Sequence, residues 1–178
     1  MKVFAILKTA ADQRRSMLYE HEVYGIVAAG ASASDSRKVG NIILSNLLKM
    51  DRQDLYAVNP KDGCCIADGR SMPLYPSVQA IDAAVDLVVI ILPAMTDCAD
   101  KGVRAMILVP GGFAEIHRNQ DVEAHILRLA RDKGFRVMGP NCLEIIYAGG
   151  ADGKGFNTFF APYEKFTLSF EKETMWPC

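Results

Sequence analysis

The sequence predicts an α/β protein with a Rossmann-like, doubly wound and mostly parallel sheet. Short apolar runs that are typical of buried strands alternate with stretches whose apolar residues recur at helical spacing. The apolar runs end in small residues, polar residues or proline, where a parallel sheet places its ligand-binding loops. Strands that alternate with helices favour parallel pairing with right-handed crossovers.

The first half of the chain is expected to contain seven such elements. A short edge strand over 1–7 and a polar helix over 9–20 would lead into a buried strand over 23–29. A helix is expected over 39–50, because apolar residues recur there at helical spacing. A second strand over 55–58, a short strand over 64–67 within a loop, and a helical turn over 77–81 capped by Ser77 follow.

The second half continues the alternation up to residue 138. Apolar runs predict strands over 86–92, 103–109 and 135–138, and helical spacing predicts helices over 96–101 and 121–133. The alternation then stops, apart from a strand expected over 166–170. The domain organisation expected is a lead-in (1–22), one Rossmann-like domain (23–162) and a C-terminal tail (163–178).

Composition excludes several classes of function. The 178 residues carry a formal net charge of −1, which gives no general attraction to nucleic acid or membrane surfaces. The five cysteines are odd in number and lack a C-x-x-C pair, so neither a disulfide framework nor a zinc site is expected. We expect a soluble cytoplasmic protein with reduced thiols, no membrane segment and no metal.

The loop between the first strand and its helix is the strongest candidate for a binding site. It consists of the small residues Gly30, Ala31, Ser32, Ala33 and Ser34, which let a backbone turn sharply and approach a ligand closely. A strand, a small loop and a helix in this order place backbone N–H groups where they can bind an anion. The loop therefore predicts a phosphate-bearing ligand, in the manner of a dinucleotide fold.

The ends of the other strands should line the same crevice. Ligands of open parallel sheets lie outside the carboxyl ends of the strands. The residues found at these ends are Asn59 with Lys61, Pro93, Pro110 with Gly111 and Gly112, and Asn141.

The second strand end bears on which ligand is bound. A fold that binds NAD has G-x-G-x-x-G in the first loop and an acidic residue after the second strand. Here the loop has one glycine before Gly40, and the second strand ends in Asn59 with Lys61 close behind. An ammonium group suits a phosphorylated ribose, as in NADP or coenzyme A, although a solvated surface lysine explains Lys61 equally well.

Six motifs, in order, resemble a known enzyme domain. They are GASAS…KVGNIILSNLL, AVNPK, YPSV, DLVVIILPA, KGVRAMILVPGGFAE and GPNCLE. The domain they resemble is the N-terminal coenzyme A-binding domain of the NDP-forming acyl-CoA synthetases, relatives of the succinyl-CoA synthetase α subunit. The resemblance covers about 23–162.

The resemblance implies coenzyme A as the ligand and a role for several of the matched positions. Residues 30–34, with Lys38 and Val39, would wrap the phosphates of the coenzyme. Lys61 would meet its ADP portion. The path of the pantetheine arm would be lined by Pro93, Gly111, Gly112 and Asn141.

The resemblance also implies what this chain lacks. Family members continue into a domain with a phosphorylated histidine and work with an ATP-grasp unit, and neither has a counterpart here. None of His21, His117 and His125 lies in a comparable context. We therefore expect no catalytic residue in this chain, and an acid–CoA ligase activity (ADP- or GDP-forming) only with a partner domain or subunit. The alternatives are a stand-alone module that binds coenzyme A or a nucleotide without catalysis and, less favoured, an NADP-type redox protein.

Overall fold

The computed structural model of the chain describes residues 23–61, 63–90, 95–111, 120–142, 145–147 and 155–165. The elements expected over 1–7, 9–20 and 166–170 lie outside these residues. The side chains of residues 95–97, 120 and 122 are likewise outside the description.

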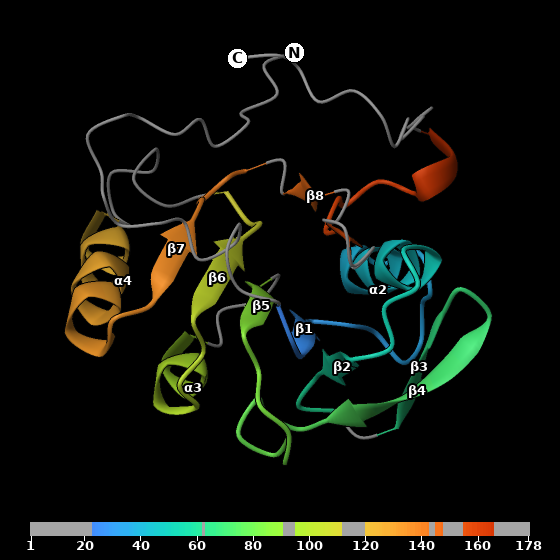
Figure 1. Cartoon of the computed structure of the whole chain (residues 1–178), viewed down its shortest axis with the longest axis horizontal. Helices are drawn as coiled ribbons and strands as arrows, with labels where there is room; N and C mark the ends of the chain where they lie inside the picture. Colours follow the sequence, from blue (N-terminus) through green and yellow to red (C-terminus); the bar gives the residue numbers. More distant parts are fainter. Residues whose placement is uncertain are drawn as a thin grey trace.

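Seven strands form one sheet in the order β3-β4-β2-β1-β5-β6-β7 (Figure 1). Neighbouring strands pair in parallel except β3 and β4, which are antiparallel. The strands are β1 (Ile26–Ala29), β2 (Leu55–Val58), β3 (Cys64–Ala67), β4 (Arg70–Tyr75), β5 (Leu87–Ile90), β6 (Ala105–Leu108) and β7 (Arg136–Met138). The expected Rossmann-like, mostly parallel sheet is confirmed, and its strand order reverses direction between β1 and β5.

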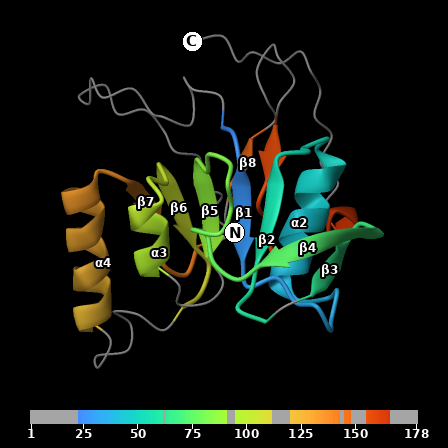
Figure 2. The ribbon, with the colours of Figure 1, turned by 90° about the horizontal axis from the view of Figure 1, so that it is seen from below.

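Helices cover both faces of the sheet, as Figures 1 and 2 show. Helix α2 (Val39–Lys49) lies on one face, together with the two-stranded sheet of β8 (Ile146–Tyr147) and β9 (Phe156–Asn157). Helices α3 (Met95–Asp100) and α4 (Gln120–Lys133) lie on the other face. A short 3-10 helix, η2 (Tyr163–Lys165), ends the described chain.

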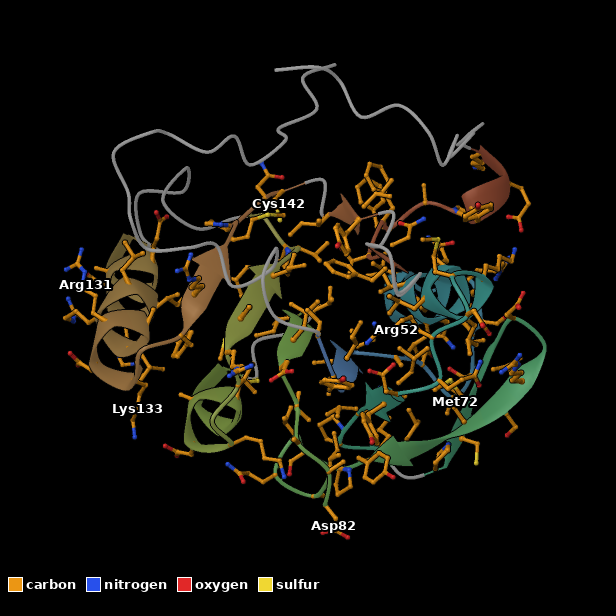
Figure 3. The ribbon with its side chains drawn as sticks, viewed as in Figure 1. Arg52, Met72, Asp82, Arg131, Lys133 and Cys142 are labelled. Carbon is orange, nitrogen blue, oxygen red and sulfur yellow. The ribbon has the colours of Figure 1, made fainter. Side chains whose placement is uncertain are left out.

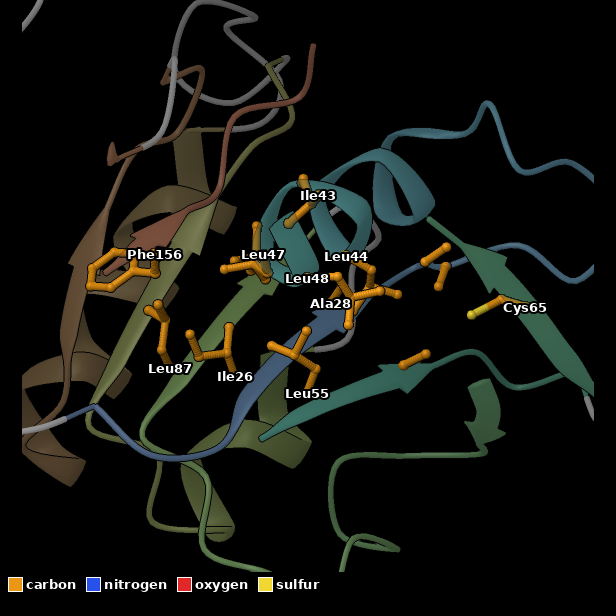
Figure 4. Packing of buried hydrophobic residues seen from close by; sticks show 14 of the residues in the cluster. Ile26, Ala28, Ile43, Leu44, Leu47, Leu48, Leu55, Cys65, Leu87 and Phe156 are labelled. Atoms are coloured by element: carbon orange, nitrogen blue, oxygen red, sulfur yellow. The ribbon is translucent and has the colours of Figure 1, made fainter. Parts of the chain in front are cut away.

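The core is divided between the two faces by the alternation of side chains along each strand. In β1, Ile26 and Ala28 point toward α2, and Val27 and Ala29 point toward α3 and α4. The α2 side also contains Phe156, which packs with the apolar face of α2 (Figure 4). All four residues of β1 are at most 1% exposed, as expected of a central strand covered on both faces.

The structure differs from the expected elements in four places. Residues 70–75, expected as loop, form β4, and the β8–β9 pair was not expected at all. The turn over 77–81 is not helical, although the Ala80 N–H does donate to the Ser77 hydroxyl at 3.3 Å. The strand expected over 23–29 begins only at Ile26, because Gly25 has a φ of 65° and its N–H donates to the Asp54 carboxylate.

No helix within the described ranges is long and apolar enough to cross a membrane. Those ranges also contain no group of three or more His, Cys, Asp or Glu side chains arranged to hold a metal ion.

Candidate functional site

The loop after β1 is in backbone contact with helix α2. Gly30 leaves the strand with a φ of 115°, and its N–H donates to the Val58 carbonyl at 2.8 Å. A Cβ on Gly40, in the first turn of α2, would lie 2.7 Å from the Ala31 nitrogen, closer than side chains approach backbone. Glycine at position 40 therefore sets how closely the helix approaches the loop. The signal in the sequence was the glycine itself. The last glycine of dinucleotide-binding loops likewise allows the helix and the strand to pack closely.

Asn41 of α2, a second residue that the sequence analysis missed, holds the loop from its buried side. Asn41 is fully buried, and its side-chain oxygen accepts the Ser32 N–H at 2.7 Å. Its side-chain nitrogen donates to the carbonyls of Ser32, at 2.9 Å, and Ile66, at 3.0 Å. The available signal was a polar residue at a position of α2 that faces the core.

The rest of the loop is organised by its own side chains. The Ser32 hydroxyl accepts the N–H groups of Asp35 and Ser34, at 3.2 and 3.3 Å. The Asp35 carboxylate accepts two bonds from Arg37 at 3.0 Å, one from its backbone N–H and one from its side chain. The side-chain hydrogen bond from Arg37 is the main reason that the pKa of Asp35 is lowered from its ordinary value.

The top of the loop presents groups suited to an anion. The side chains of Ser34 and Lys38 are exposed, and Lys38 precedes the first turn of α2 without capping it. The N–H groups of Ala33 and Val39 donate to no group within the described part of the chain. Backbone donors at a helix N-terminus beside an ammonium group favour a phosphate or a carboxylate.

Asn59 joins the end of β2 to this loop. Its side-chain nitrogen donates to the Ala31 carbonyl at 2.6 Å, and its side-chain oxygen accepts the Lys61 N–H at 2.9 Å. The first bond fixes the loop, and the second closes a turn that carries the exposed Lys61 side chain. The positions predicted after the first two strands, 30–34, 38, 39, 59 and 61, thus lie together.

The remaining predicted residues form a second group at the ends of β6 and β7. The Asn141 N–H donates to the Pro110 carbonyl at 3.1 Å, and Asn141 has a φ of 54°. Gly111 follows Pro110 and is exposed. Strand β5 separates this group from the loop after β1, and the ends of the parallel strands place both groups at one edge of the sheet. Pro93 and Gly112 lie outside the described residues.

Cys142, which follows Asn141, lies beside the second group. Its thiol contacts the Leu108 carbonyl at 3.3 Å, and the side chain packs against the core on the α2 side (Figure 3). It is half-buried and makes further contacts of its own.

Together, the fold and the loop define a class: a Rossmann-like domain with a loop of small residues, suited to an anion, at the central strand next to the reversal of strand order. Comparison with protein families identifies one family within this class. Residues 25–148 match the family described as CoA binding domain, and the chain belongs to that family.

The relatives agree with the resemblance seen in the motifs. The chain is 33% identical over 130 residues to the α subunit of ADP-forming acetate–CoA ligase I of Pyrococcus furiosus, a match that covers 68% of this chain and 28% of the relative. It is also 33% identical over 128 residues to ADP-forming acetate–CoA ligase I of Archaeoglobus fulgidus, covering 68% of this chain and 18% of the relative. The chain thus spans less than a third of the length of these relatives.

A solved structure shows the same fold. It is the dinucleotide-forming acetyl-coenzyme A synthetase 1 of Ca. Korarchaeum cryptofilum in complex with phosphate and ADP. The TM-score is 0.63 at 29% identity, over 78% of this chain and 29% of that one. The resemblance to NDP-forming acyl-CoA synthetases is therefore confirmed.

Proposed function

We propose that this domain binds coenzyme A, or an acyl-CoA, with the phosphates at the loop after β1. The observation that carries the proposal is the pair of hydrogen bonds made by Asn59, which hold the loop and the Lys61 turn against each other. A ligand with a diphosphate and a separate ribose phosphate suits this arrangement, since one anion can meet the loop and the other Lys61. The family to which the chain belongs supports the choice of coenzyme A.

In this proposal the two groups of residues divide the ligand between them. Residues 30–34, with Lys38 and Val39, bind the diphosphate, and Lys61 binds the 3′-phosphate of the ribose. The pantetheine arm crosses the end of β5 toward Pro110, Gly111 and Asn141, along a path that Pro93 and Gly112 complete. Two strand spacings separate β1 from β6, about 10 Å, which an extended pantetheine arm can span.

We further propose that the domain supplies coenzyme A to an ADP- or GDP-forming acid–CoA ligase. The ligases to which the chain is similar support this step. The thioester chemistry would need a phosphohistidine domain and an ATP-grasp unit from partner domains or a partner subunit. The described residues supply binding groups, and we assign none of them to catalysis.

Calorimetric titration with four ligands tests the binding proposal. Coenzyme A should bind more tightly than dephospho-coenzyme A, and NAD and NADP should bind more weakly than coenzyme A. Replacing Lys61→Ala should weaken coenzyme A binding about tenfold and leave dephospho-coenzyme A unchanged, because one charge-assisted bond to phosphate is removed. Lys165→Ala, at another exposed lysine, in η2, is the control and should change neither affinity.

Two results would count against the proposal. Equal affinities of the wild-type protein for coenzyme A and dephospho-coenzyme A would remove the role of Lys61. Tighter binding of NAD or NADP than of coenzyme A would replace the ligand and favour the redox alternative.

A further inference from the structure

We infer that Asn41 is a positioning residue for the ligand loop, and that through it the β3–β4 hairpin takes part in coenzyme A binding. The inference rests on the proposed function, because the loop is the proposed site of the phosphates. Asn41 itself is buried beneath the loop, so it acts on the ligand only through the backbone that it holds.

The hydrogen bonds of Asn41 are the first argument. An asparagine side chain has two N–H donors and one carbonyl acceptor group, and Asn41 uses all three on backbone. Two of these bonds hold both sides of residue Ser32, its N–H and its C=O. Because asparagine is a poor helix former and a buried amide is costly without partners, these bonds account for its presence in α2.

The position of Ser32 in the loop is the second argument. With its N–H turned toward Asn41, Ser32 accepts the N–H groups of Ser34 and Asp35 on its hydroxyl. The preceding carbonyl, of Ala31, is held from the β2 side by Asn59. Two asparagines from two elements thus fix adjacent residues, which leaves the top of the loop in one preset shape. A loop that is ordered before binding loses less conformational entropy when the ligand arrives.

The third bond of Asn41 extends the support to the edge of the sheet. The Asn41 amide donates this bond to the Ile66 carbonyl in β3, the edge strand of the sheet, which pairs with β4. The hairpin also approaches the loop at Gly63, where an added Cβ would lie 3.9 Å from the Ala33 side chain. A displacement of β3 is therefore transmitted to Ser32 through one amide group.

The chain provides a matched control in Asn46. This residue is on the same helix, is 1% exposed, and donates to two backbone carbonyls, those of Phe159 and Ala161, at 2.8 and 2.9 Å. Its partners belong to the C-terminal segment and not to the loop. Substitutions at positions 41 and 46 therefore remove the same kind of hydrogen bond from the same helix. Only the substitution at position 41 removes bonds to the loop.

The test compares Asn41→Asp with Asn46→Asp in the full 178-residue chain. Each change keeps the shape of the side chain but sets a carboxylate against two carbonyl oxygens. Amide exchange of Ser32, followed by NMR without ligand, should become at least tenfold faster in Asn41→Asp and stay within twofold of wild type in Asn46→Asp. The coenzyme A Kd should rise about 10- to 100-fold in the first variant and less than twofold in the second. Asn41→Ala, which adds no charge, serves if Asn41→Asp does not fold.

The outcomes separate the inference from the proposed function. Equal coenzyme A affinity, or equally slow Ser32 exchange, in the Asn41 and Asn46 variants would overturn the inference. Failure of the wild-type protein to bind coenzyme A, with Ser32 exchange accelerated only by the Asn41 variants, would overturn the proposed function and leave Asn41 as the residue that shapes the loop.

Discussion

Gly40 shows how one missing side chain fixes the distance between an element and a binding loop. Alanine is the better helix former by about 1 kcal/mol, so propensity alone predicts that Gly40→Ala stabilises the protein. The added Cβ would instead meet the backbone of Ala31 at 2.7 Å, and backbone cannot rotate away as a side chain can. We expect Gly40→Ala to lower the free energy of unfolding by about 1–3 kcal/mol in urea. A gain in stability would show that the loop moves away at no cost.

Asp35 gives the loop a pH dependence whose sign is fixed by its partner. Arg37 lowers the pKa of Asp35, so the ionised carboxylate is favoured in the folded loop. Its contribution is present above the ordinary pKa of about 4 and is lost as the pH falls through the lower value in the folded protein. NMR titration should show that Arg37→Gln raises the pKa of Asp35 toward the ordinary value. Lys38→Gln should raise it less, since Lys38 acts through space only; equal shifts would contradict the assignment.

At the same scale, the sequence indicated the proposed ligand-binding positions, Asn59 among them, but not the support that Asn41 gives the loop. The small residues 30–34 and the Asn-Pro-Lys turn have a distinctive composition, because a close approach to phosphate permits few residue types. Asn41 is an ordinary polar residue until the fold brings Ser32 and Ile66 to it from two other elements. Bonds of that kind depend on tertiary structure, so the local pattern shows only a polar residue at a core-facing position of the helix and not what it binds.

Strands with a continuous apolar run were predictable, as was the short edge strand β3, but β4, which lies between β3 and β2, was not. The expected bounds of β2, 55–58, match the structure because its apolar run is continuous. Strand β4 carries an arginine, a serine and a proline, so it lacks the apolar alternation of a half-buried strand. The signal that remained was Asp68-Gly69, a pair typical of two-residue hairpin turns. Both residues have positive φ, 47° and 73°.

The same turn supports a prediction about the hairpin. An added side chain at Gly69 would meet nothing within 4 Å, so the cost of substitution there comes from the backbone conformation alone. Gly69→Val should lower the free energy of unfolding by about 1–2 kcal/mol, and Gly69→Asn by much less, because asparagine tolerates the left-handed region. Chemical denaturation of both variants measures the difference. Equal losses would mean that the turn does not keep its φ values in solution.

At the scale of the whole molecule, the core on the α2 side is completed by residues 155–165, far along the chain from α2. Phe156 is 1% exposed and completes the core on the α2 side, whereas Phe160, four residues later, is 38% exposed. Phe156→Ala should cost about 3–5 kcal/mol of stability, as large-to-small changes of buried aromatic residues do. Phe160→Ala should cost less than 1 kcal/mol, within the range of surface changes. Similar losses in urea unfolding would show that residues 155–165 do not pack on α2.

This packing has a consequence for how the protein folds while it is being synthesised. The Asn46 amide bonds the Phe159 carbonyl, 113 residues later in the chain, so the ribosome completes α2 long before the segment that covers it. Until then the core on the α2 side, which includes Ile43 and Leu47, lacks Phe156. The nascent chain therefore leaves part of the apolar face of α2 uncovered until residues 155–165 have been made, and folding of this half of the core finishes only after those residues leave the exit tunnel.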